Sequence, residues 1–166
     1  MAAHAGTLAF EAPLAALGAT VPMRTTTRLV AVRRTEQRRA AIWALYQSDL
    51  LGRPLEQTSP PDVPAFTRAV AQLVREHQTE LDELIRSHAS GWSLERIAPL
   101  ERSILRVGLA ELLYGAELPG DTPIPPEGAI DEAVETAKRF CGAEAPAFVN
   151  GILGAVLREL QEVRPK

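Results

Sequence analysis

The chain has 166 residues, of which 46% are hydrophobic and 5% aromatic, and its formal net charge is −3. This length and composition are typical of one globular domain with an aliphatic core. No apolar run reaches the roughly 18 residues of a membrane span, the first 23 residues do not resemble a secretory signal, and the single Cys141 excludes an internal disulfide. We therefore expect a cytoplasmic protein.

The hydrophobic spacing predicts helices throughout the chain. The first helix is expected to end before Gly52 and Pro54, and a proline-rich connector then extends to residue 63. Ser93 is expected to cap a short turn that ends near Ile97. The main helices are expected at about residues 33–51, 64–88, 99–114 and 145–162, and a further helix before the last one carries an apolar stripe of Ile130, Ala133, Val134 and Ala137.

The helix over 99–114 carries apolar residues almost all round its axis. A helix of this kind is buried on every side, so we expect it to be the central post of the fold. No strand pattern, hairpin turn or internal repeat is present. The sequence therefore predicts an all-α protein, a compact bundle of six to seven helices around a buried central helix.

The positive charge is concentrated near the N-terminus. Residues 24–39 contain six arginines and one acid, Glu36, so this stretch carries +5 and the rest of the chain −8. A basic stretch in an acidic protein indicates a localised contact with phosphate. A solvated, charged helix start is the more common explanation of such a run, so the cluster is a weak signal by itself.

Residue types that carry catalysis or hold metals form no recognisable constellation. The sequence has no phosphate-binding glycine loop, no HExxH motif and no pair of cysteines. His77 and His88 fall on the apolar side of their helix and are interpreted as hydrogen-bonded residues at the core or its edge. The acids Asp131, Glu132 and Glu135 are interpreted as a solvated face. The sequence predicts no enzyme, no cofactor and no metal site.

The last helix combines a core stripe with an outward face of small residues. Ala147, Gly151 and Gly154 lie opposite the apolar stripe, and Phe148 lies roughly 110° from the centre of that stripe, beside the small face. An isolated Phe usually packs against a neighbouring helix. An aromatic ring at the edge of bare backbone favours a contact surface, on which a stacked base contributes about 1–3 kcal/mol.

Four segments, in one order, carry a resemblance to a known family. They are RRTEQRRAAIWALYQSDL (33–50), GWSLERIAPLERSILRVGLAELL (91–113), AIDEAVETAKRF (129–140) and AFVNGIL (147–153). Together they resemble the bacterial transcription antitermination factors of the NusB family, over about residues 33–160. The resemblance implies two small helical sub-bundles. It also implies binding to boxA RNA of ribosomal RNA leader transcripts, together with a small-subunit ribosomal protein (NusE) and RNA polymerase.

The resemblance also assigns roles to individual residues. It implies RNA contacts for Arg33, Arg34, Arg38, Glu144 and Phe148. The guanidinium groups of the first helix are expected at the edge of the core, where they can reach phosphates while their stems pack. Tyr46 and Glu101 are implied in the surface for the protein partner or the RNA. The loop over 115–126 is longer than is usual in the family.

The resemblance sets the expected domain boundaries. Residues 28–162 are expected to form the domain, 1–27 a disordered extension and 163–166 a short tail, with Met23 as a possible translation start. A helical protein-interaction module without RNA contact remains an alternative function. The RNA-binding domain of a ribosomal RNA methyltransferase is a weaker alternative, because few residues follow the last helix.

Overall fold

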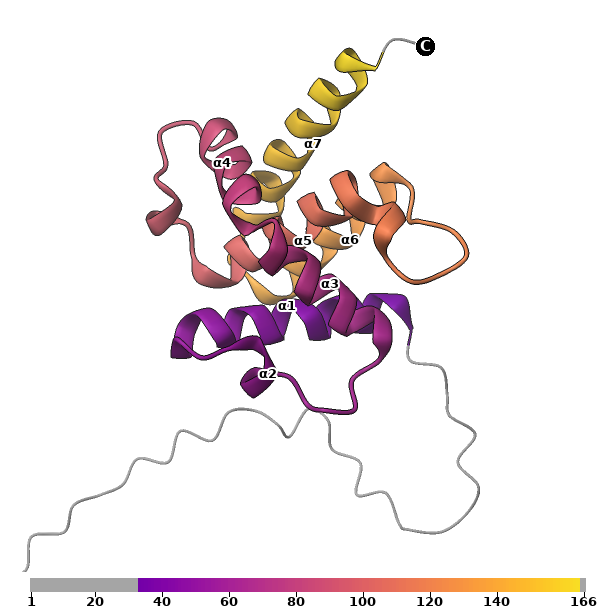
Figure 1. Cartoon of the computed structure of the whole chain (residues 1–166). Coiled ribbons are helices and arrows are strands. Elements are labelled where there is room, and N and C mark those ends of the chain that lie inside the picture. Colours follow the sequence, from indigo (N-terminus) through magenta and orange to yellow (C-terminus); the bar gives the residue numbers. More distant parts are fainter. Residues whose placement is uncertain (1–32, 165–166) are drawn as a thin grey trace, which may run out of the picture. The chain divides into compact units, whose positions relative to one another are not determined.

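The computed structural model describes residues 33–164, and the boundary expected at residues 1–27 lies outside them. These residues form seven α-helices and two short 3-10 helices, with no strand among them (Figure 1), which confirms the all-α prediction. The elements are α1 (Arg34–Leu51), α2 (Leu55–Thr58), α3 (Ala65–Glu76), α4 (Gln78–His88), η2 (Leu94–Arg96), α5 (Pro99–Tyr114), η3 (Gly115–Glu117), α6 (Pro126–Phe140) and α7 (Ala145–Val163).

The helix ends follow the punctuation of the sequence. Gly52 ends α1 in the left-handed conformation, with φ at 61°, and its N–H donates to the carbonyl of Ser48. Pro99 and Pro126 occupy the first positions of α5 and α6, where a proline costs no helical hydrogen bond. Ser93 precedes η2, but its hydroxyl makes no capping hydrogen bond, so the predicted cap is wrong.

The single long helix expected over residues 64–88 is wrong, because His77 divides it into α3 and α4. At His77 the backbone leaves the helical region, with φ at −107° and ψ at 12°. The imidazole stacks on the ring of Tyr114, with ring centres 3.8 Å apart, and its Nδ1 lies 3.7 Å from a carboxylate oxygen of Glu80. This break lets both halves of the segment pack on α5.

Helix α5 is the central post, as predicted (Figure 1). All nine residues from Ser103 to Glu111 are buried, and α5 contacts α1, α3, α4, α6 and α7. Among the other helices, α1 packs against α2 and α3, and α7 packs against α4 and α6. Two groups of helices therefore share α5, which places residues from α1, α6 and α7 around it.

The interior contains charges that the apolar pattern did not predict. Arg106 of α5 is buried and donates to both carboxylate oxygens of Asp82, at 2.7 and 3.1 Å, and to Asp49 at 2.7 Å. Asp49 also accepts a hydrogen bond from Arg75 at 2.9 Å. This network joins α1, α3, α4 and α5 and satisfies the buried guanidinium.

Among residues 33–164, none of the helices has the length and continuous apolar character that a membrane span requires.

Candidate nucleic-acid interface

An exposed aromatic ring lies between α1 and the C-terminal end of α6. The side chain is that of Phe140, which is 39% exposed. Its ring centre is 5.4 Å from that of Trp43, and the two rings meet edge-on at 81°. The guanidinium carbons of Arg39 and Arg139 lie 5.8 and 5.4 Å from the Phe140 centre. We call Arg39, Trp43, Arg139 and Phe140 the aromatic–arginine patch.

Helical spacing explains why these residues meet. Arg39 and Trp43 are four positions apart, so they share one face of α1. Tyr46 continues this face, and its ring meets that of Trp43 edge-on, with centres 5.7 Å apart. Phe140 is the last residue of α6 and directly follows Arg139 in a basic final turn. The patch thus depends on two helices that are distant in the sequence.

The two cations of the patch are available to an anionic ligand. Within residues 33–164, neither Arg39 nor Arg139 forms an ion pair with an acid. The Nε of Arg39 is buried there without a hydrogen-bond acceptor. A guanidinium near an aromatic ring is held by the ring's negative face and keeps N–H groups for phosphate. An aromatic ring with arginines beside it also offers a stacking platform to a base.

The residues predicted for the protein partner border this patch. Tyr46 contacts Trp43, as described above, and Glu101 stands in the first turn of α5 beside Cys141. Burial raises the pKa of Glu101 above its ordinary value. Burial and the nearby Glu101 charge raise the pKa of the Cys141 thiol to about 11, so this thiol is an unreactive neutral group at physiological pH. The predicted partner residues and the aromatic–arginine patch form neighbouring surfaces.

Two further predicted RNA contacts, Glu144 and Phe148, lie at the start of α7. Glu144 is exposed and directly precedes α7, and its carbonyl accepts the Phe148 N–H at 3.2 Å. The Phe148 ring is half-buried and packs against the core. Ala147 and Gly151 are exposed, and a Cβ added at Gly151 meets nothing within 4 Å, so the outward small face is confirmed there; Gly154 is half-buried, and a Cβ added to it lies 3.5 Å from Nη1 of Arg158.

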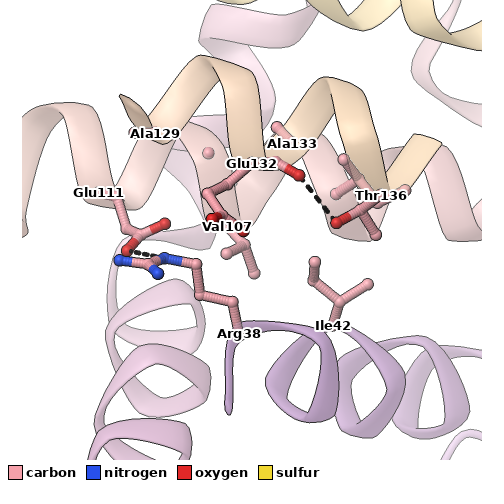
Figure 2. Close-up of a pocket in the computed structure, with 10 residues that line it drawn as sticks. Arg38, Ile42, Val107, Glu111, Ala129, Glu132, Ala133 and Thr136 are labelled. Carbon is pink, nitrogen blue, oxygen red and sulfur yellow. Dashed lines mark hydrogen bonds and ion pairs between the residues drawn. The ribbon is translucent and has the colours of Figure 1, made fainter. Parts of the chain in front are cut away.

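The three arginines predicted to contact RNA at the start of α1 differ in their exposure to solvent. Arg33 and Arg34 are exposed, but Arg38 is buried, and its Nε donates to Glu111 at 2.7 Å. Figure 2 shows this ion pair beside a cavity between α1, α5 and α6. The cavity volume of about 10 Å³ suits one water molecule. The expectation that the Arg38 guanidinium lies at the exposed edge of the core is therefore wrong, because Glu111 holds it in the interior.

The acids around this cavity are part of the interior as well. Glu132 was expected on a solvated face, but it is half-buried, lines the cavity, and accepts a 2.8 Å hydrogen bond from Thr35. Burial raises the pKa of Glu111, and Arg38 opposes this shift through its charge and its hydrogen bond. The Arg38–Glu111 and Thr35–Glu132 contacts therefore connect α1 to α5 and α6 through buried and half-buried polar groups, and their role is to hold these helices together.

Comparison with known proteins identifies the family. The sequence model of the NusB family matches residues 35–158. The chain belongs to the NusB family. A transcription antitermination protein NusB of Saccharopolyspora erythraea is 36% identical over 131 residues, which are 74% of this chain and 85% of that protein. The NusB of Geobacillus kaustophilus is 37% identical over 136 residues, which are 79% of this chain and 100% of that protein.

Solved NusB structures share the fold. T. maritima NusB has a TM-score of 0.67 at 31% sequence identity, over 77% of this chain and 92% of that one. A structure of the antitermination factors NusB and NusE in complex with double-stranded RNA has a TM-score of 0.64 at 25% identity, over 76% of this chain and 96% of that one.

Membership of the NusB family confirms two predictions from the sequence. The all-helical fold is that of the solved NusB structures. The chain is not an enzyme, since its curated relatives are named as antitermination proteins. Residues 33–164 contain no group of three His, Cys, Asp or Glu side chains that could hold a metal ion.

Proposed function

We propose that this NusB-family protein binds single-stranded boxA-like RNA together with a NusE-type small-subunit ribosomal protein, and that the pair joins RNA polymerase in an antitermination complex. The observation that carries the RNA-binding part is the exposed Phe140 ring with two guanidinium groups within 6 Å of its centre. Arg33 and Arg34, exposed at the start of α1, add positive charge.

The chemistry of the patch favours unpaired RNA. An exposed ring can stack only on a base that has left a helix, whereas the deep major groove of double-stranded RNA hides its base edges. Each stacked base contributes about 1–3 kcal/mol, and the arginines supply phosphate contacts that do not depend on sequence. The proposed RNA-binding surface also includes half-buried Phe148 and exposed Glu144. Buried Arg38 has an indirect role, because it holds α1 in place.

The partner protein is proposed to bind next to the RNA. A structural neighbour was solved as NusB with NusE and double-stranded RNA. In this chain Tyr46 and Glu101 border the aromatic–arginine patch, so a protein bound there lies beside the RNA and can stabilise it. A helical module that binds only protein is the competing function.

Titration of the chain with boxA-like and scrambled single-stranded RNA at two salt concentrations separates these functions. If about four phosphates are neutralised, the log–log salt slope is near −3. We expect tighter binding of the boxA-like RNA and this slope. A flat salt response with equal, weak binding of both RNAs would exclude the RNA-binding function.

Variants then locate the surface. Phe140→Ala is expected to weaken RNA binding by roughly five- to a hundredfold, and Arg39→Ala to make the salt slope about 0.7 less negative. Trp92→Ala is the matched control for the first change, because Trp92 is also an exposed aromatic residue, at 55%. Arg86→Ala on α4 is the control for the second, since its partner Glu83 lies on the same helix.

A further inference from the structure

The exposed Arg34 is held in one orientation by groups from two other parts of the chain. Its guanidinium carbon lies 4.1 Å from the centre of the Phe66 ring of α3. Its Nη2 donates to the carbonyl of Pro119, in the loop between α5 and α6, at 3.0 Å. Its Nη1 donates to Gln37 at 3.2 Å.

Gly120 makes the approach of this loop possible. Its φ is 136°, a backbone conformation that side chains disfavour, and a Cβ added there lies 2.9 Å from Nη2 of Arg34. Any residue larger than glycine at this position therefore meets the guanidinium. The loop over 115–126, which is longer than is usual in the family, thus packs against the arginine.

The charge around Arg34 also favours this position. Arg38 stands one helical turn away and its guanidinium carbon lies 5.2 Å from the same Phe66 ring. Glu111 pairs with Arg38, and its charge interacts with Arg34 too. The buried carboxylate thus offsets the repulsion between two neighbouring cations, and Arg34 remains at the surface with N–H groups to spare.

We propose that Phe66 and the loop at Pro119 and Gly120 are positioning residues, which hold Arg34 ready to contact a phosphate of the RNA. This inference rests on the proposed RNA-binding function. Immobilising a flexible side chain on binding costs about 0.5–1.5 kcal/mol, and an arginine fixed beforehand avoids that cost. Releasing Arg34 should therefore weaken RNA binding about two- to tenfold.

The test is a double-mutant cycle on RNA affinity with Gly120→Ala, Arg34→Ala and both together. Gly120→Ala is expected to weaken binding about two- to tenfold in the otherwise wild-type protein and to have no further effect once Arg34 is alanine. Equal weakening in both backgrounds, or none in the first, would overturn the proposal. Gly91→Ala is the matched control, because Gly91 also has a positive φ, 77°, but no atom within 4 Å of an added Cβ. It should leave the RNA affinity unchanged.

Side-chain NMR of the RNA-free protein provides a readout that does not depend on binding. Arg34 Nε–H should show slow guanidinium rotation and a high heteronuclear NOE, both lost in Gly120→Ala and retained in Gly91→Ala. A freely rotating Arg34 in the wild-type protein would overturn the positioning inference even if RNA binds. A fixed Arg34 in a protein that binds no RNA would instead refute the proposed function and, with it, the role of this arginine.

Discussion

Substitution of Arg38 by Met should destabilise the fold strongly rather than act on RNA contact alone. The substitution removes the partner of Glu111, whose side chain is 2% exposed. The adjacent cavity of about 10 Å³ can admit no more than one water to solvate the carboxylate. Leaving one member of a buried ion pair unpaired costs about 3–5 kcal/mol. For a domain of this size the loss corresponds to a decrease in Tm of roughly 10–20 °C.

Thermal and urea denaturation followed by circular dichroism measure this loss, and two further results are expected. The double substitution Arg38→Met with Glu111→Leu should recover most of the stability, because it replaces the pair by apolar side chains. The cost of Arg38→Met alone should decrease as the pH falls, since burial raises the pKa of Glu111 and a protonated carboxyl is neutral. An Arg38→Met protein with wild-type stability and weakened RNA binding would refute the structural role.

Three other predictions address the rest of the molecule. Phe148→Ala should both lower stability, by about 1–3 kcal/mol, and weaken RNA binding, because the ring is half-buried; unfolding without any specific effect on RNA would make it a core residue only. Tyr46→Ala and Glu101→Gln should reduce affinity for the NusE-type partner, measured by calorimetry, more than affinity for RNA, and equal losses would mean that the two surfaces are inseparable. Burial lowers the pKa of His88, but hydrogen bonds to Leu84 and Glu159 outweigh it and raise that pKa above 6.5; the stabilisation is therefore complete below pH 6.5 and lost as the pH rises through the raised pKa. His88→Gln should thus lower Tm at pH 5.5 and not at pH 9, and an equal decrease at both would contradict this.

Local patterns predicted most helix boundaries because capping and hydrophobic spacing act within a few residues. Gly52, Pro99 and Gly115 mark helix ends in the sequence, and the all-round apolar pattern identified α5 as the central helix. The break at His77 had no such signal. The break coincides with stacking of His77 on Tyr114, which is 37 positions along the chain. This tertiary contact accompanies the break without a glycine or proline at that position.

The burial of charged side chains was the feature that the sequence predicted least well. A charged residue in an amphipathic pattern is ordinarily solvent-exposed, so Arg38 was expected at the edge of the core and Glu132 on a solvated face. Burial of Arg38 depends on Glu111, 73 positions away, and burial of Arg106 on Asp82 and Asp49. Pairing over such separations is a property of the tertiary structure.

Only the local part of the candidate site could be predicted, because the rest depends on contacts between residues far apart in the sequence. The basic start of α1 is a local feature and could be read from the sequence, but the aromatic–arginine patch requires Trp43 and Phe140 to meet across two helices. The signal that could have indicated Phe140 is its place in the basic final turn of α6, directly after Arg139. An aromatic residue beside a cation at a helix end is suggestive only when its exposure is known.

Ultraviolet crosslinking of the wild-type protein to single-stranded boxA-like RNA, with the modified peptides identified by mass spectrometry, tests the central claim most directly. The account predicts crosslinks at exposed Phe140 or at half-buried Trp43, whose ring meets that of Phe140 edge-on between α1 and α6. Crosslinks confined to Trp92, or to α4, would place the RNA on another face and contradict it.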